Sequence, residues 1–252
     1  MCSDAGPPWV YRGHMSGYGQ FCPVAKTAEL LCERWAPLIL RELMGGSCRF
    51  GEIQRGVPLI SPSLLSKRLH QLVSAGVVEH HGAGRDSTYT LTTSGWELHP
   101  VIEAMGIWGQ RWARSRYTPD ELDPSFLMWD IRRMLRPAGL ADRRIVIEMW
   151  IRDGPPRRTT YWMVVDDAID LCLVDPGLEV DLRVNSDLRT LTRIWMGDTV
   201  MRDEIGDGRV ELWGPPELTE RFPAWLGCHP ILGGVREAES SVRGDDGPRG
   251  PG

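Results

Sequence analysis

The chain has 252 residues, of which 42% are hydrophobic and 25% charged, a balance that excludes a disordered or fibrous protein. This length predicts two domains, because single cores usually split beyond about 200 residues. No stretch approaches the roughly 20 apolar residues of a membrane span, and the N-terminus lacks the basic and apolar runs of a secretion signal. The expected location is therefore the cytoplasm, without a membrane partner.

The net charge of −5 argues by itself against a nucleic-acid partner, but the charge is unevenly divided. Residues 1–117 carry 12 Lys and Arg against 9 Asp and Glu, a balance of +3. Residues 118–252 carry 17 against 25, a balance of −8. A polyanion would therefore be attracted by the first half and repelled by the second.

The six cysteines predict free thiols. They form no Cys-x-x-Cys pair and lie in no histidine-rich frame, so neither a metal nor another cofactor is expected. They are Cys2, Cys22, Cys32, Cys48, Cys172 and Cys228.

Three helices are predicted after a disordered arm over residues 1–19. The first opens at Cys22-Pro23, because proline is tolerated at a helix's first position. The second runs from about Pro37 to Met44 and ends at two glycines, and the third begins at Arg49. The apolar face of the first helix is expected to consist of Val24, Leu30 and Leu31.

A fourth helix, over Ser61–Leu72, is the most informative segment of this half. Ser61 is placed to cap it, Pro62 occupies the first position, and leucines at 65, 69 and 72 define a core face. An ordinary amphipathic helix has the same spacing, but a helix in a DNA major groove also needs short polar side chains and a cation outside. The outward face here presents Ser63, Ser66, Lys67 and His70.

A β-hairpin is predicted next, from Val77–His81 and Ser87–Leu91 with a turn over residues 82–86. Three helices, a recognition-type helix and a hairpin make up the order of a winged helix-turn-helix. Arg85 at the wing tip would meet a phosphate or the minor groove, although a lone arginine in a turn is more often simply solvated.

The last helix of this half is expected to begin at Ser94, which has capping-box spacing with Glu97. Pro100 should kink its first turns. Its apolar stripe could pack on the second domain or on the same helix of another copy, and we favour the second copy. The stripe consists of Leu98, Val101, Met105, Trp108 and Trp112.

Several of these motifs in series resemble the HxlR family of winged-helix regulators, over about residues 20–115. The residues that carry the resemblance are Cys22-Pro23-Val24, Trp35, Leu38–Leu43, Arg49-Phe50, Ile53, Ser61, Leu65, Arg68-Leu69, Leu72, Tyr89–Thr92, Gly95 and Trp108-Gly109. The resemblance implies a homodimer on a palindromic double-stranded DNA operator, read by two recognition helices and two wings. The expected DNA-binding residues are Arg49, Ser61, Ser63, Ser66, Lys67, Arg68, His70 and Arg85.

The chain departs from the family at two places. The family often has Gly-Lys-Trp where this chain has Glu33-Arg34-Trp35, and the wing strand Glu79-His80-His81 is less basic than usual. The resemblance also implies that a cysteine at the position of Cys22 can sense oxidants. The helix dipole would favour its thiolate, but the simpler interpretation, which we favour, is that Cys22 caps and packs the first helix.

The second half reads as an α+β domain over residues 125–228, after a linker at 118–124. A helix ending before Pro137 is followed by strand-like runs that we expect to form an antiparallel meander, then by two helices, a strand and a final helix. The strands are Arg144–Ile151, Thr159–Val165, Ile169–Val174, Val180–Val184 and Val210–Trp213, and the later helices are Asp187–Gly197, one from Thr199 and Leu218–Leu226. The tail, residues 229–252, is predicted to be disordered.

Large apolar side chains in this domain could line a cleft, or could simply fill a core. The runs Val184–Gly197, Gly208–Gly214 and Phe222–Leu226 resemble the sterol-carrier-protein-type lipid-binding fold, which implies a small hydrophobic effector. The candidate pocket residues are Trp195, Met196, Met201, Trp213, Phe222 and Trp225.

The sequence thus predicts a bacterial, sequence-specific transcription regulator whose second domain senses a hydrophobic ligand. The alternative is a lipid-binding or scaffolding protein that uses the winged helix for dimerisation. An enzyme is not expected, because nucleophile-elbow, phosphate-loop and zinc-protease motifs are missing from the sequence. The neighbouring carboxylates Asp166, Asp167 and Asp170 are expected to be solvated in a turn.

Overall fold

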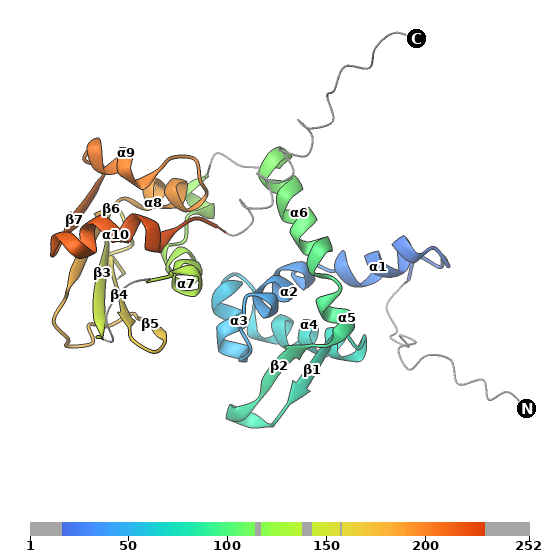
Figure 1. Cartoon of the computed structure of the whole chain (residues 1–252). Coiled ribbons are helices and arrows are strands. Elements are labelled where there is room, and N and C mark those ends of the chain that lie inside the picture. The colour runs from blue at the N-terminus through green and yellow to red at the C-terminus, as the bar shows by residue number, and fades with distance from the viewer. Residues whose placement is uncertain (1–16, 114–116, 138–142, 157, 230–252) are drawn as a thin grey trace, which may run out of the picture. The chain divides into compact units, whose positions relative to one another are not determined.

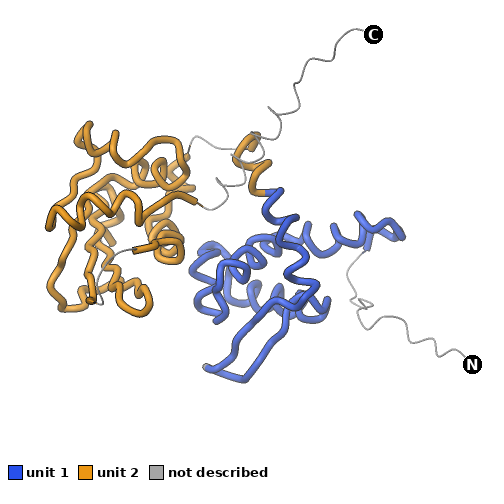
Figure 2. Tube along the Cα trace, in the orientation of Figure 1, with its two compact units in different colours: residues 1–105 blue, residues 106–252 orange. Residues whose placement is uncertain are grey.

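The computed structural model describes residues 17–113, 117–137, 143–156 and 158–229 (Figure 1). The chain divides into two compact units, residues 1–105 and 106–252 (Figure 2). The division falls inside helix α6, His99–Trp112. Nearly all of the predicted disordered arm and tail lies outside the described residues, as does Cys2.

Unit 1 begins with the four predicted helices. They are α1 (Pro23–Leu31), α2 (Ala36–Met44), α3 (Phe50–Gly56) and α4 (Pro62–Ser74). The prediction for α1 is wrong in one respect: Leu31 is buried, but Val24 is 76% exposed and so does not face the core. Seven positions make nearly two turns, so Val24 lies on the same side of α1 as Leu31, but in the first turn of the helix. The residues of α1 that reach the core, Leu30 and Leu31, lie at its other end.

The hairpin follows as predicted, with β1 (Val78–His81) antiparallel to β2 (Thr88–Leu91). The turn between them contains a single 3-10 turn, η1 (Gly84–Asp86). Gly82 has φ +73°, and a Cβ there would lie 2.7 Å from the Asp86 carbonyl oxygen, so the turn requires glycine. The hairpin extends away from the helices as a wing (Figure 1).

The core of unit 1 consists of leucine, isoleucine and valine side chains from α1 to β1, together with one buried carboxylate. Glu42 is fully buried, and Arg41 Nη2 donates to its Oε1 at 2.8 Å and to the Gly56 carbonyl at 2.9 Å. A Cβ on Gly56 would lie 1.8 Å from Glu42 Oε2. The close approach of α2 to the end of α3 therefore depends on glycine at position 56.

The helix predicted from Ser94 is in fact two helices, α5 (Thr93–Trp96) and α6. The N-cap is Thr92, whose Oγ1 accepts from the Gly95 N–H at 3.1 Å, so the capping box of Ser94 is wrong. Ser94 Oγ instead donates to the Gly76 carbonyl at 3.0 Å. Because α5 ends at Trp96 and a new helix begins at His99, Pro100 lies in the first turn of α6 and not inside a longer helix.

Unit 2 is a five-stranded mixed sheet with helices, which confirms the α+β class. The sheet order is β5-β4-β3-β6-β7, with the remaining elements as predicted to within a few residues (Figure 1). The strands are β3 (Ile145–Ile151), β4 (Thr160–Val165), β5 (Ile169–Cys172), β6 (Leu182–Ser186) and β7 (Val210–Trp213). The helices are η2 (Pro119–Glu121), α7 (Pro124–Met134), α8 (Leu188–Trp195), α9 (Met201–Gly206) and α10 (Pro216–Leu226).

The prediction of an antiparallel meander is wrong for one strand pair, because β6 lies parallel to β3. Asp181, just before β6, fixes this pairing. Its backbone N–H donates to the Val146 carbonyl at 3.0 Å, and its Oδ2 accepts from the Val146 N–H at 2.9 Å. The composition of a segment indicates that it forms a strand, but it does not indicate which other strand it pairs with. The sequence therefore could not show that β6 pairs with β3.

The core of unit 2 lies between one face of the sheet and the helices. Four candidate pocket residues, Trp195, Met201, Phe222 and Trp225, are buried in that core, and Met196 packs against it. Trp213 does not belong with them: it is 49% exposed. Val210 and Leu212 face the core, so the next residue along the strand must point to the other face.

Candidate DNA-binding surface

Helix α4 separates its apolar and polar residues as the sequence predicts. Leu65, Leu69 and Leu72 are at most 1% exposed, and the side chain of Ser61 accepts from the Leu64 N–H at 3.3 Å. The cap and the buried leucines fix both the start of the helix and its rotation. The residues left on the exposed face, at spacings of three and four, are Ser63, Ser66, Lys67 and His70.

Arg68 is held within the unit. Its Nη2 lies 2.5 Å from Glu33 Oε2, its Nε donates to the Arg34 carbonyl at 3.0 Å, and its Nη1 donates to Gln71 at 2.6 Å. Glu33 occupies the position where the family often has glycine. The departure in sequence therefore supplies a partner for Arg68, which anchors the α1–α2 connection to α4.

That connection also contains a backbone feature that the sequence did not suggest. Trp35, the N-cap of α2, has φ +82°, a left-handed conformation that is unusual for a tryptophan. The Arg34 guanidinium lies 4.8 Å from the centre of the Trp35 ring, a cation–π contact. Arg34 is exposed, so its positive charge remains at the surface, next in sequence to the Glu33 that pairs with Arg68 of α4.

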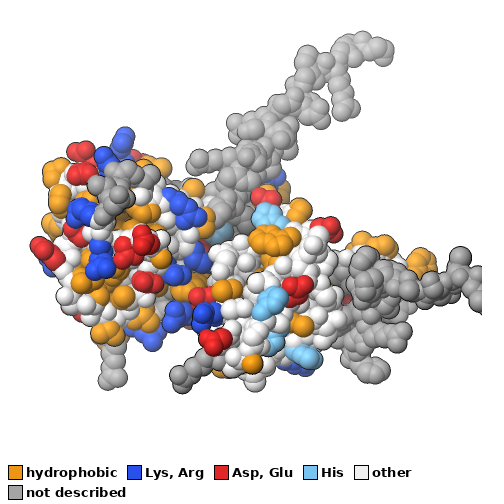
Figure 3. All heavy atoms as spheres, turned by 60° about the horizontal axis from the view of Figure 1, so that its bottom comes forward, with side chains coloured by type: hydrophobic (Ala, Val, Ile, Leu, Met, Phe, Trp, Pro, Cys, Tyr) orange, Lys and Arg blue, Asp and Glu red, His pale blue; other side chains and the backbone are white. Residues whose placement is uncertain are grey.

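The wing contributes histidines more than arginines. His80 stacks on Tyr89 with ring centres 4.7 Å apart, and His81 hydrogen-bonds to Thr90 across the hairpin at 2.9 Å. Several histidine side chains are visible on the face of unit 1 shown in Figure 3. Arg85 lies in η1 at the tip, with its side chain outside the described part, and Arg49 is exposed where α3 begins.

Four of the five predicted dimerisation residues lie on α6 and are exposed. The fifth, Leu98, precedes α6 and packs against the core of unit 1. None of the fourteen residues of α6 is buried. Exposed fractions rise along the stripe, from 39% at Val101 and 49% at Met105 to 62% at Trp108 and 71% at Trp112. Phe21, 99% exposed just before α1, is a further apolar residue of this kind that the periodicity did not single out.

The five cysteines in the described ranges are free thiols. Cys22 is the N-cap of α1 and its side chain makes no capping hydrogen bond. The pKa of Cys48 is raised, first by burial and then by the charge of Glu52, whose carboxylate also accepts from the Cys48 N–H at 3.0 Å. Cys48 is therefore kept as a thiol. Within the described residues, His, Cys, Asp and Glu side chains do not gather into a group that could hold a metal.

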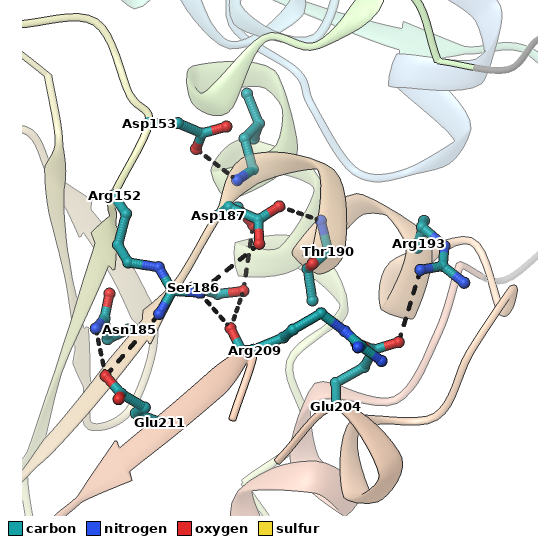
Figure 4. Close-up of polar contacts among 11 residues, drawn as sticks. Arg152, Asp153, Asn185, Ser186, Asp187, Thr190, Arg193, Glu204, Arg209 and Glu211 are labelled. Atoms are coloured by element: carbon teal, nitrogen blue, oxygen red, sulfur yellow. Dashed lines mark hydrogen bonds and ion pairs between the residues drawn. The ribbon is translucent and has the colours of Figure 1, made fainter. Parts of the chain in front are cut away.

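Unit 2 contains a polar network around the junction of β6 and α8 (Figure 4). Asp187 caps α8 by accepting from the Thr190 N–H at 2.8 Å. Glu204, 1% exposed, is bound by Arg209 and lies 3.8 Å from Arg193. The hydrogen bond from Arg209 lowers the pKa of Glu204 although burial opposes it. These carboxylates stabilise the fold. Of the three carboxylates predicted to lie in a turn, Asp166 and Asp167 do so, whereas Asp170 lies within β5; all three are exposed.

Unit 1 therefore has the elements of a winged helix-turn-helix: a recognition helix with an exposed polar face, followed by a two-stranded wing. The profile of the family described as HxlR-like helix-turn-helix matches residues 30–117. The HTH-type transcriptional regulator YvaP of Bacillus subtilis is 34% identical over 112 residues, which are 43% of this chain and 95% of YvaP. The regulator YodB of the same organism is 36% identical over 94 residues, 36% of this chain and 84% of YodB.

The chain belongs to the HxlR family of helix-turn-helix transcriptional regulators. Its family and relatives are regulators and not enzymes. A solved structure titled as the reduced form of the transcriptional regulator YodB is 34% identical, with a TM-score of 0.33, and covers 38% of this chain and 97% of that one. In the described ranges, no helix is long and apolar enough to cross a bilayer.

Proposed function

We propose that the chain represses or activates transcription by binding a palindromic operator as a homodimer, with α4 of each copy in a major groove. The observation that carries this proposal is the exposed polar face of α4, where Lys67 stands among Ser63, Ser66 and His70 opposite a fully buried leucine face. Hydroxyl and imidazole groups can read base edges, and the lysine can contact phosphate. Arg68, which is bound to Glu33, would position the helix and not contact DNA.

The homodimer of this proposal is formed through the α6 stripe, with Phe21 and Val24 as further exposed apolar residues. Four large side chains at spacings of four, three and four residues make a continuous apolar seam. Met105→Glu places a charge in the seam and should convert the dimer to a monomer in sedimentation velocity of dilute samples. His99→Glu, roughly 120° around the same helix from Met105, is the matched control and should leave the dimer intact.

Sensing of a hydrophobic ligand by unit 2 is a separable part of the proposal. It is supported by the resemblance of residues 125–228 to the sterol-carrier-type fold and by the apolar layer between sheet and helices, which includes Trp195 and Phe222. Titration of the full chain with a fluorescent fatty acid should give saturable binding. A linear, non-saturating signal would remove this part of the proposal and leave DNA binding untouched.

Redox sensing by Cys22 is likewise a proposal, supported by the position of its thiol at the positive end of α1. Cys22→Ser should abolish any response of operator binding to a thiol oxidant. Cys32→Ser, at the exposed C-cap of the same helix, is the control and should respond like the native chain.

The experiment that tests DNA binding is a titration of the full chain against the intergenic DNA beside its own gene and an unrelated duplex, over a series of salt concentrations. Affinity should fall steeply with salt, because phosphate contacts release counterions, and the unrelated duplex should bind at least about 10³-fold more weakly. Equal, salt-insensitive binding to both would favour the lipid-binding or scaffolding alternative.

A further inference from the structure

The sheet of unit 2 has a second face that carries exposed tryptophans. Along each strand the core takes every other residue, for example Ile147, Met149 and Ile151 of β3. The alternate residues lie on the opposite face, which we call the outer sheet face. Trp150 there is 46% exposed and Trp213 49% exposed, values high for side chains of this size. On the visible surface of unit 2, hydrophobic side chains are interspersed with charges of both signs (Figure 3).

The strand register arranges the outer face in a row across four strands. Trp162 of β4 lies opposite Glu148 of β3, Glu148 opposite Arg183 of β6, and Arg183 opposite Trp213 of β7. Arg183 Nε and Glu148 Oε1 form an ion pair of 3.2 Å at the centre. The row therefore reads tryptophan, acid, base, tryptophan, with neighbouring strands about 4.8 Å apart.

This row is complementary to itself under a two-fold rotation. An axis parallel to the strands and midway between β3 and β6 turns a second sheet face-down onto the first. Each Glu148 then lies opposite Arg183 of the partner subunit, and each Trp162 opposite Trp213 of the partner subunit. An isologous interface requires this kind of self-complementary patch.

The next row of the face agrees with the same axis. Trp150 of β3 lies opposite Asn185 of β6, so the rotation brings Trp150 of the partner subunit over Asn185. Asn185 Nδ2 donates to Glu211 at 2.6 Å, but its Oδ1 is buried and lacks a hydrogen-bond partner among the described residues. That oxygen is already buried in a single chain, so the contribution of Trp150 of the partner subunit is apolar contact and not a hydrogen bond to Asn185.

We propose that the outer sheet face binds the outer sheet face of a second copy of this chain, in addition to the contact through α6. The charge pattern favours this partner over a polyanion or a strongly charged protein, because its centre is one acid beside one base. The two rows cover only roughly 19 Å by 14 Å, well below the ~800 Å² per partner of a standard interface. The contact is therefore weak by itself. It either adds to the α6 contact between the two subunits of one dimer or links one α6 dimer to another.

The test is a charge exchange followed by sedimentation equilibrium of the full chain, in the native background and with Met105→Glu to remove the α6 contact. Glu148→Arg places two like charges opposite each other in a dimer of identical copies, and so does Arg183→Glu. A mixture of the two variants restores opposite charges at both positions. Asp166→Arg is the matched control, since Asp166 forms an ion pair of the same 3.2 Å with Arg144 just past the ends of β4 and β3, outside the two rows.

We expect each single variant to weaken self-association at least about tenfold in the Met105→Glu background and the equimolar mixture to recover it, with Asp166→Arg unchanged. In the native background, any species larger than the α6 dimer should be lost in each single variant and should return in the equimolar mixture. Equal association of both variants, their mixture and the control, or a Met105→Glu chain that is monomeric at every concentration, would overturn the proposal. Circular dichroism of each variant verifies that the fold is retained.

Discussion

The proposed binding surfaces of the two units are built in different ways. In unit 1 the candidate DNA-binding surface is polar and belongs to one helix, α4, whose leucines are buried on the opposite side. In unit 2 the exposed feature is aromatic and is assembled from four strands. A surface on one helix follows from spacing along the chain, whereas a surface across strands depends on pairing. The comparison therefore separates what local sequence determines from what only the sheet register determines.

The largest expected effect on stability is in unit 1, at Gly95. A Cβ there would lie 2.2 Å from the Val77 carbonyl oxygen, a backbone atom that cannot move without disrupting β1. Gly95→Ala should destabilise the chain by about 3 kcal/mol or more. Gly51→Ala, in a helix and with open space around it, is the control and should be neutral or slightly stabilising. Hydrogen exchange should show the loss of protection in β1 and α5.

A smaller effect is expected in unit 2, at Glu204. Glu204→Gln removes the charge that Arg209 binds and should cost about 1–3 kcal/mol, with hydrogen exchange increasing at β7 and α9. Because folding lowers the pKa of Glu204 below 4.5, its contribution is present above that pH and is lost as the pH falls further. As the pH falls below 4.5, the stability of the native chain should therefore decrease more than that of the variant. Glu220→Gln, at an exposed position of α10, should retain the native pH profile.

The smallest effect is expected at the cap of α4. Ser61→Ala removes the acceptor of the Leu64 N–H and should cost about 1 kcal/mol in denaturant unfolding. Ser61→Asp keeps an acceptor there and should be close to the native value. If alanine and aspartate were equivalent, the start of α4 would not depend on its cap.

The elements of both units could be predicted from spacing and breakers, and the Ser61 cap is an example. The sequence could not show that Thr92 and not Ser94 caps the segment before α6, because both are short hydroxyl side chains near the same turn. It could not show that Glu33 binds Arg68, because the two residues are 35 positions apart. The orientation of Trp213 was missed because a shift of one residue along a strand exchanges the faces of the sheet.

The most direct test of the central claim compares the only two lysines of the chain. Lys67 lies on the outward face of α4, and Lys26 lies on α1, where it pairs with Glu29 at 3.0 Å. We expect Lys67→Glu to lower operator affinity by at least about 100-fold while the fold is retained, and Lys26→Glu to bind like the native chain. Native affinity in Lys67→Glu would contradict the assignment of α4 as the DNA-reading helix.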